Sequence, residues 1–277
     1  MPVYNGEKYI QEALDSLLSQ TYTSFELIIS DNASTDKTQQ ICEEHAKGDS
    51  RIRYIRQPQN KGAIANFQFV LDEAVGEYFM WAAADDKWSN NWIEILLKDM
   101  IKTKNTAFFG QVLTIDAASK PLTHPANSRI FNFSGNKFLR RVKYYFELES
   151  LGKANVIYGL YKLNDIKYID LSKFEFDYNI NYELLRCLEI KSNQDAILYK
   201  RLHSSNAGEG NFSNKLNEKS VIQKYIDGLC LPFKQRRMLL VSYLTQSSVP
   251  EKIILVMLYV PKVVLMYFSK IKQIIKF

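Results

Sequence analysis

The sequence predicts an α/β fold, with a mostly parallel sheet flanked by helices and a helical appendage at the C-terminal end. Two observations predict the sheet: short apolar runs of the kind found in strands covered on both faces, and stretches with helical spacing of apolar residues between them. Strands and helices alternate with short connections over the first hundred residues, so parallel strands with right-handed crossovers are expected. After about residue 210 only helical patterns continue, which predicts the appendage.

The first half of the chain has the clearest alternation. Ile10, Ala13, Leu14 and Leu17 recur at helical spacing, whereas residues 25–30 form a short apolar run. Ser34 or Thr35 is expected to cap the next helix. The resulting elements are helices at about 10–18, 35–47, 64–74 and from 91, and strands at 25–30, 51–57 and 77–82.

The second half is less regular. Strands are expected at 106–115, 155–161 and 195–202, and helices at 137–146 and 181–190. Three more helices, at 216–230, 233–244 and 251–275, follow the Gly208-Glu209-Gly210 break and are separated by Pro232 and Pro250. These patterns divide the chain into a domain of residues 1–210, with halves at 1–105 and 106–210, and a helical extension at 211–277.

Composition and charge narrow the classes of partner. The 277 residues are 46% hydrophobic and 24% charged, which excludes a disordered or collagen-like chain. Of the formal charge of +6, residues 250–277 carry +4, from five lysines and Glu251. The rest of the chain is nearly neutral, so nucleic acid is not an expected partner. Three cysteines without a C-x-x-C spacing favour a reducing compartment and disfavour a cysteine metal site.

Polar residues gather directly after three of the expected strands, where ligands bind in open α/β sheets. The clusters are residues 3–7, residues 30–36 and the pair Asp85-Asp86. Adjacent carboxylates repel each other, and a divalent cation that bridges to phosphates is a common reason to hold them together. Each cluster alone could be a turn or a helix cap. Their joint placement at three strand ends favours a binding site.

Four segments resemble, in order and spacing, the family 2 inverting glycosyltransferases. They begin with Met1-Pro2-Val3-Tyr4-Asn5-Gly6-Glu7-Lys8-Tyr9-Ile10 and continue with residues 26–36, 60–78 and 85–88. The resemblance is specific over residues 1 to about 100 and weaker as far as Gly208. It implies a Rossmann-like GT-A fold and an enzyme of bacterial cell-surface polysaccharide synthesis. Residues 1–105 would bind the nucleotide sugar, and residues 106–210 the acceptor.

The resemblance also implies roles for residues on the nucleotide side. Val3, Tyr4 and Glu7 would form part of the nucleotide pocket, together with Lys61 and Asn66, and Asp85 would lie beside the diphosphate. Asp31 would hydrogen-bond the base, which in this family is usually uracil. Asn32 departs from the family pattern, because it stands where a second acid usually follows Asp31.

A Mn²⁺ or Mg²⁺ ion on the diphosphate is implied as the cofactor. Asp85 matches the second acid of the family's Asp-x-Asp element, but Ala83 stands in the place of the first acid. Two alternatives follow: weakened metal binding, or a metal set of Asp85, Asp86 and His203. His203 follows Lys200-Arg201 and resembles the family's basic-then-His element, with an expected metal or diphosphate contact. A surface histidine in a basic strand is the alternative.

Inverting transfer requires a base that takes the proton of the acceptor hydroxyl. In the resembling family this base is an acid near a helix that aligns with residues 176–185, and Asn181 occupies its position here. An amide cannot act as the base. Asp177, one helical turn earlier, and Glu183, two residues later, are therefore both candidates, and Asp177 is preferred because Glu183 can equally be a solvated helix residue.

The C-terminal segment combines an apolar surface with flanking lysines. Such a helix can lie in a membrane interface with its lysines at anionic headgroups, or it can pack on the domain or a second subunit. The apolar stretch 253–268 is interrupted by Pro261 and Lys262, so it is expected to fall short of a membrane span. Residues 250–277 are therefore expected to touch the inner face of the cell membrane from the cytoplasm.

The predicted function is transfer of a hexosyl or related sugar from a nucleotide sugar, expected to be UDP-linked, to a hydroxyl of a glycan or lipid-linked glycan, with inversion. Two alternatives belong to other classes. One is a non-catalytic partner that keeps the fold. The other is a sugar nucleotidyltransferase, which would favour a Gly-rich basic loop after the first strand, and Tyr4-Asn5-Gly6-Glu7-Lys8 is not such a loop.

Overall fold

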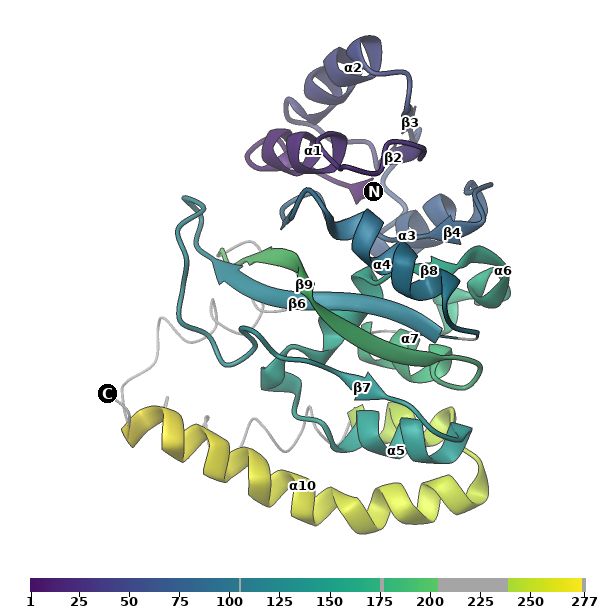
Figure 1. The fold of residues 1–277 in the computed structure, drawn as a ribbon, viewed down its shortest axis with the longest axis vertical. Coiled ribbons are helices and arrows are strands. Elements are labelled where there is room, and N and C mark those ends of the chain that lie inside the picture. Colours follow the sequence, from purple (N-terminus) through teal and green to yellow (C-terminus); the bar gives the residue numbers. More distant parts are fainter. Residues whose placement is uncertain (105, 175–176, 204–238, 276–277) are drawn as a thin grey trace.

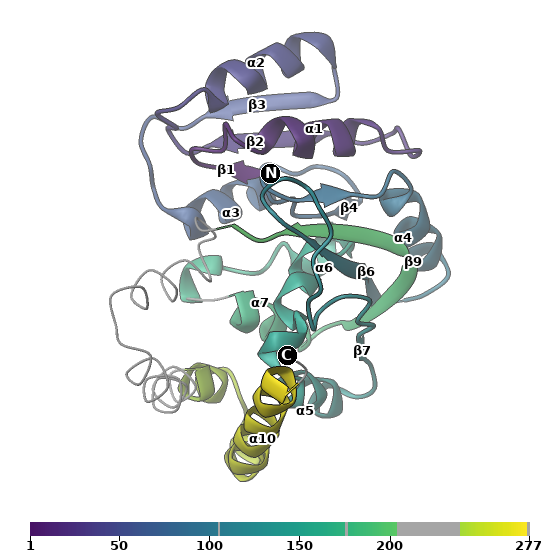
Figure 2. The same cartoon turned by 90° about the vertical axis from the view of Figure 1, so that its left-hand side faces the viewer.

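The computed structural model describes residues 1–104, 106–174, 177–203 and 239–275. Side chains are described as far as Ser269. The helix expected at 216–230 lies outside the described residues, as does the first part of the one expected at 233–244. The first sheet and the C-terminal helix lie at opposite ends of the molecule, with the longest strands between them (Figures 1 and 2).

Three parallel strands form the first sheet, in the order β1 (Pro2–Val3), β2 (Leu27–Asp31) and β3 (Ile52–Arg56). The helices α1 (Ile10–Leu18), α2 (Thr38–Gly48) and α3 (Ala63–Asp72) connect or follow them. All five residues of β2 are buried, as expected for a strand covered on both faces. The alternation predicted for the first half is confirmed here.

The next segment leads into the middle of the molecule. It contains β4 (Tyr78–Phe79), β5 (Lys87–Trp88) and α4 (Trp92–Ile101). The strand expected at 77–82 is reduced to β4, which pairs antiparallel with β8 (Tyr161–Lys162). Residues 80–86 continue from β4 without regular pairing and lead through Asp85 and Asp86 to β5, which contacts α1.

Two long parallel strands, β6 (Thr106–Ile115) and β9 (Glu189–Arg201), form the centre of the second sheet. Two short strands, β5 and β7 (Asn132–Phe133), pair antiparallel with β9. The β6–β9 register shifts at Gly110, where a Cβ atom would lie 2.2 Å from both the Ala196 carbonyl oxygen and the Trp92 ring. Glycine therefore lets β6, β9 and α4 approach each other closely.

The second half of the chain differs from the prediction in two places. Residues 155–161 do not form a strand: a 3₁₀-helix, η2 (Lys153–Tyr158), precedes the short β8. The helix expected at 181–190 is instead α7 (Asp177–Leu184), and β9 already begins at Glu189. The remaining elements of this half are α5 (Lys137–Phe146), η1 (Glu149–Leu151), α6 (Leu163–Ile166) and η3 (Leu171–Lys173).

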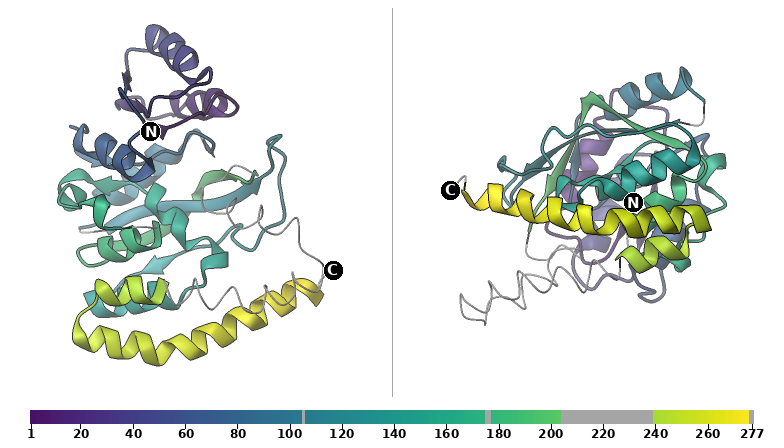
Figure 3. Two further views of the ribbon diagram at one scale, coloured as in Figure 1. Left: turned by 180° about the vertical axis from the view of Figure 1, so that it is seen from behind. Right: turned by 90° about the horizontal axis from the view of Figure 1, so that it is seen from below.

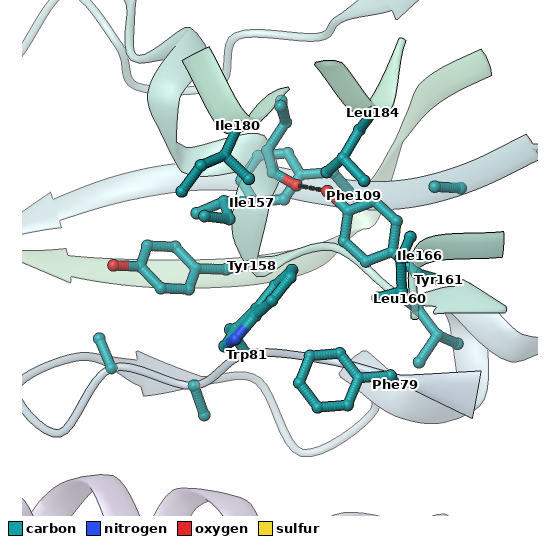
Figure 4. Packing of buried hydrophobic residues seen from close by; sticks show 14 of the residues in the cluster. Phe79, Trp81, Phe109, Ile157, Tyr158, Leu160, Tyr161, Ile166, Ile180 and Leu184 are labelled. Carbon is teal, nitrogen blue, oxygen red and sulfur yellow. Dashed lines mark hydrogen bonds between the residues drawn. The ribbon is translucent and has the colours of Figure 1, made fainter. Parts of the chain in front are cut away.

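Aromatic side chains pack between η2, β8 and the segment around β4. The Trp81 ring lies edge-on to Phe79, with the ring centroids 4.7 Å apart, and close to Tyr161 and Ile157 (Figure 4). Tyr158 lies at the margin of this cluster, and its hydroxyl points away from the other labelled side chains. The packing holds η2 against the segment that leads to Asp85.

The C-terminal helix α10 (Val249–Ile275) runs along the side of the molecule farthest from the first sheet and packs on α5 (Figures 1 and 3). Pro250 lies in its first turn, where proline is tolerated because the first amides have no partner within the helix. Pro261 lies inside α10 and does not end it. Of the described helices, α10 alone is long and apolar enough to cross a membrane, over Val249–Ser269. The expectation that Pro261 and Lys262 make this stretch too short is therefore wrong.

Candidate active site

The loops that follow β1 and β2 are joined to each other. The Asn32 amide donates to the Val3 carbonyl oxygen at 2.9 Å, and the Thr35 amide donates to Asn5 Oδ1 at 2.8 Å. Asn5 and Ala33 have φ values of 51° and 61°, in the left-handed region that most residues avoid. Such strain is stored most often at functional sites. These contacts bring the first two predicted clusters to one surface.

Asp31 ends β2 and is fully buried. Its Oδ1 accepts from the Ser34 amide at 2.8 Å, while Oδ2 accepts from the Tyr54 hydroxyl at 2.7 Å and from Arg56 at 2.8 Å. Burial, followed by the Asp31 carboxylate, raises the pKa of Tyr54. Asp31 thus has its contacts inside the protein, and its contact with a base stays a prediction. The Arg56 side chain, which the sequence analysis did not select, is 35% exposed beside it.

The other residues predicted for the nucleotide pocket occupy different environments. Val3 is buried, whereas Tyr4 and Glu7 are exposed. The Glu7 carboxylate accepts from the Lys37 amide at 2.9 Å, just before α2 begins. Tyr4 and Glu7 are therefore accessible to solvent at this surface. The side chain of Val3 is not, and its backbone carbonyl accepts from the Asn32 amide.

Asn66 and Lys61 are separated by the start of α3. Asn66 is buried and bonds within the protein: its amide donates to the Ser30 carbonyl oxygen at 2.9 Å, and its Oδ1 accepts from the Ser30 hydroxyl at 2.6 Å. Asn66 therefore joins α3 to β2, which differs from the predicted nucleotide contact. Lys61 is exposed, and its backbone amide donates to Asn32 Oδ1 at 2.9 Å.

Asp85 and His203 meet although 118 positions separate them. His203 Nε2 lies 3.1 Å from Asp85 Oδ2, and the two side chains are 11% and 29% exposed. The ring centroids of Tyr9 and His203 lie 4.6 Å apart, so the loop after β1 also reaches this pair. The structure thus brings together two of the three residues predicted to bind metal.

Asp86 does not join that pair. Its buried carboxylate accepts from Lys200 Nζ at 3.0 Å through Oδ2 and from the Arg201 amide at 2.9 Å through Oδ1. Burial raises the pKa of Asp86 to about 6, although the charge of Lys200 opposes this shift. Both carboxylate oxygens of Asp86 thus bond to the end of β9, where the positive charge of Lys200 compensates the carboxylate. Of the three residues predicted to bind metal, the structure brings only Asp85 and His203 together, and their metal role stays a prediction.

The remaining pair fits a divalent cation held largely by other ligands. A carboxylate oxygen and an imidazole nitrogen side by side suit first-row metals such as Mn²⁺. Within residues 1–104, 106–174, 177–203 and 239–275, no group of three or more His, Cys, Asp or Glu side chains could hold a metal ion. The other ligands would have to be phosphate oxygens and water, as is usual where an ion sits on a nucleotide.

Asp177 faces the same end of β9 from α7. Solvent reaches its side chain, yet the surrounding protein raises the pKa of its carboxyl, and the charge of Lys200 acts in the opposite direction. Lys200 Nζ lies 5.5 Å from the centroid of the Tyr158 ring. Lys200 therefore acts on two acids: it pairs with Asp86, and its charge also acts on Asp177.

Asn181, at the position of the family's base, and Glu183, the other candidate for the base, both have structural partners. Asn181 is buried and donates to the Ala154 carbonyl oxygen at 2.9 Å, which ties α7 to η2. Glu183 forms an ion pair with Arg186, with Glu183 Oε1 2.6 Å from Arg186 Nε. These contacts favour Asp177 over Glu183 as the base.

Arg201 is the largest departure from the sequence analysis at this site. His203 was expected to contact a metal or diphosphate beside Lys200 and Arg201, but the Arg201 side chain is completely buried. Its guanidinium pairs with Glu12 of α1, with Nη2 3.0 Å from Oε2. Glu12 was not selected from the sequence, since it reads as an ordinary helix residue and no local pattern indicates a partner 189 positions away.

Three comparisons with known proteins identify the fold and the family of this chain. The crystal structure of S. aureus TarS 1–349 in complex with UDP-GlcNAc superposes with a TM-score of 0.56 at 19% identity, over 74% of this chain and 58% of that one. This likeness establishes the GT-A fold. The model of the family "Glycosyl transferase family 2" matches residues 1–152, more than half of the chain. The chain belongs to glycosyl transferase family 2.

Curated relatives carry the same family name. An uncharacterized glycosyltransferase of Haemophilus influenzae is 29% identical over 222 residues, 79% of this chain and 81% of that protein. The putative teichuronic acid biosynthesis glycosyltransferase TuaG of Bacillus subtilis is 35% identical over 101 residues, 36% of this chain and 40% of TuaG. The glycosyltransferase GlyA of Streptococcus pneumoniae is 35% identical over 102 residues, 37% of this chain. The matched stretch makes up 14% of GlyA and, in an uncharacterized glycosyltransferase of Rickettsia bellii, 34% of that protein, so this chain spans less than half the length of these relatives and of TuaG.

Proposed function

We propose that this chain transfers a hexosyl or related sugar from a UDP-linked donor to a hydroxyl of a glycan or lipid-linked glycan, with inversion at the anomeric carbon. The observation that carries the proposal is the Asp85–His203 pair at the strand ends of a family 2 chain. Solved structures of TarS with UDP and UDP-GlcNAc support a UDP-sugar donor. The name of TuaG supports an acceptor in surface polysaccharide synthesis.

On the donor side, the exposed Tyr4 and Glu7 would contact the nucleotide, with Asp31 and Arg56 placed for the base and Lys61 near the phosphates. Asp85 and His203 would hold Mn²⁺ or Mg²⁺ against the diphosphate. When bound, the ion neutralises charge that develops on the departing nucleoside diphosphate.

On the acceptor side, Asp177 would act as the general base. The acceptor oxygen bonds to the anomeric carbon from the face opposite the diphosphate, the bond from that carbon to the phosphate oxygen breaks, and the hydroxyl proton passes to the Asp177 carboxylate. Two features support this role: the raised pKa of the Asp177 carboxyl and its access to solvent. Lys200 acts electrostatically on Asp177 and pairs with Asp86, the neighbour of Asp85. Its positive charge would also attract the phosphates of the donor.

We further propose that α10 lies on the inner face of the cell membrane. Its outward side exposes eight apolar side chains at helical spacing: Val249, Ile253, Val256, Met257, Val260, Val264, Leu265 and Phe268. Its inward side is held by two ion pairs, Arg141–Glu251 at 2.9 Å and Lys262–Glu149 at 2.5 Å. Because a spanning helix would have to break both buried pairs, the structure favours a helix that lies flat in the interface.

The test is release of UDP from a panel of UDP-sugars, with Mn²⁺ and a glycan acceptor extract. Turnover by the wild-type chain and its loss in Asp85→Ala are expected. A chain that binds UDP-sugars but never releases UDP would instead be the non-catalytic partner. Release of pyrophosphate from a nucleoside triphosphate and a sugar phosphate would identify a nucleotidyltransferase.

A further inference from the structure

Arg201, the last residue of β9, is a buried arginine that bonds to four residues in three separate parts of the chain. Its guanidinium donates to the Asp85 carbonyl oxygen at 2.9 Å and to Glu12 Oε2 at 3.0 Å. It also donates to Ser119 Oγ at 2.9 Å and to the Asp116 carbonyl oxygen at 3.2 Å. A planar fork with five N–H groups can serve several acceptors at once, which a lysine ammonium cannot do with the same geometry.

The acid that compensates Arg201 is itself fixed. Glu12 Oε2 accepts from the Ser119 hydroxyl at 2.6 Å and lies 3.2 Å from Lys87 Nζ. The hydrogen bond from Ser119 is the largest of the contacts that lower the pKa of Glu12. Arg201 and Glu12 therefore form a rigid connection between α1, the turn at 116–120 and the end of β9.

The guanidinium of Arg201 contacts Asp85 directly and is connected to His203 through the Tyr9 ring. It holds Asp85 through the backbone carbonyl of that residue. Its carbon lies 4.6 Å from the centroid of the Tyr9 ring, and that ring lies 4.6 Å from the His203 ring. Tyr9 is buried, and its hydroxyl has no hydrogen-bond partner among the described residues, so its contribution comes from the ring.

We propose that Arg201 is a positioning residue for the metal pair: it fixes the backbone of Asp85 and, through the Tyr9 ring, the orientation of the His203 imidazole. Residues that orient metal ligands commonly change metal affinity about 10- to 100-fold when they are replaced. Ala83 stands where the resembling family has the first acid of its metal-binding element. Asp85 and His203 would therefore hold the ion as a pair, so their relative placement matters more. This inference rests on the proposed metal role of Asp85 and His203.

The test is Mn²⁺ binding to the full chain in the presence of UDP, followed by electron paramagnetic resonance. In Arg201→Lys, which keeps the charge, the dissociation constant should rise about tenfold, the lower end of the range for such residues. Arg140→Lys is the matched control, because Arg140 is also a buried arginine that donates to backbone carbonyls, those of Leu185 and Arg186, away from this pair. Its Mn²⁺ affinity should equal that of the wild type, even if its melting temperature falls.

A second pair of variants keeps the test decisive if Arg201→Lys does not fold. Tyr9→Leu keeps the hydrogen bonds of Arg201 but removes the ring, and its Mn²⁺ affinity should fall several-fold. Tyr9→Phe keeps the ring and should bind Mn²⁺ as the wild type does. Wild-type affinity in Arg201→Lys, or in Tyr9→Leu where Arg201→Lys does not fold, would overturn the inference alone. A wild-type chain that binds UDP but no Mn²⁺ would overturn the metal assignment, and the inference with it.

Discussion

Lys200 Nζ lies 3.0 Å from Asp86 Oδ2, and this ion pair separates the roles of two adjacent acids. Asp86 is fully buried against Lys200, whereas Asp85 remains 29% exposed and faces His203. The repulsion expected between neighbouring carboxylates is thus relieved mainly by a protein cation at one acid, which leaves the other acid for a ligand.

Lys200→Met should destabilise the protein, because it leaves the Asp86 carboxylate buried without its counter-ion. Breaking a buried pair costs about 3 kcal/mol, and the loss should appear in the free energy of unfolding in urea. The double variant Lys200→Met with Asp86→Asn should recover most of the loss. Lys98→Met removes an exposed pair with Glu94 and should cost less than about 0.5 kcal/mol. Equal losses in the two single lysine variants would contradict the structural role of the pair.

Asp177→Asn should lower kcat by about 10² to 10⁴, the usual contribution of a general base, while UDP affinity stays unchanged. Glu183→Gln is the matched control on the same helix, since the Glu183 carboxylate pairs with Arg186. Because the base must be ionised and partial loss of hydration beside the surrounding protein raises its pKa, activity should fall as the pH drops through a value above 3.8, the ordinary pKa of this carboxyl. A kcat loss in Glu183→Gln instead of Asp177→Asn would exchange the two assignments.

Regular local patterns predicted the elements that depend on them. The helix at 137–146 was predicted with the bounds that α5 has, because its apolar period is clear and Asn136 caps it by accepting from the Leu139 amide. The apolar run at 155–161 gave a wrong strand, since such a short run has no decisive period. There Gly159 lies against β6, where a Cβ atom would be 2.7 Å from the Phe108 carbonyl oxygen. Only the tertiary contact reveals this arrangement.

The place of the candidate site in the fold was predictable from the sequence, whereas the partners of its side chains were not. The rule that ligands bind at strand ends located the loops around residues 5, 33 and 85. Which of the adjacent acids is paired inside the protein was not predictable, because it depends on Lys200, which lies 114 positions from Asp86. The buried state of Arg201 likewise follows from Glu12 and Ser119, on elements remote in sequence.

An aspartate at the centre of the exposed face of α10 should release the protein from membranes. Met257 and Val260 are each 66% exposed, so Met257→Asp or Val260→Asp should leave the fold intact. Burial of this apolar face in the membrane interface contributes to the free energy of membrane binding in proportion to the apolar area buried. A charged side chain removes that contribution at its own position. Flotation with anionic liposomes should show several-fold less bound protein. Val75→Asp, at an exposed apolar residue away from α10, is the control; equal binding by all variants would contradict the membrane proposal.

Glu149 should make the attachment of α10 sensitive to acid. Burial opposes its ionisation, but Lys153 and Lys262 outweigh this effect and lower the pKa of Glu149 from 4.5 to about 2. Because the unfolded chain takes up this proton first, the stabilisation is fully present above about pH 5 and is lost as the pH falls from 4.5 toward 2.

The free energy of unfolding, measured in urea between pH 6 and pH 3, should therefore decline more steeply for the wild type than for Glu149→Gln, which has no proton to gain there. At pH 3 the difference should reach about 2 kcal/mol, because linkage gives about 1.4 kcal/mol for each pH unit below 4.5. Glu44→Gln changes an exposed glutamate of α2 and should follow the wild-type curve. Parallel curves for wild type and Glu149→Gln would show that the two lysines do not hold Glu149 ionised. In that case the Lys262–Glu149 contact would not be what keeps α10 on the domain.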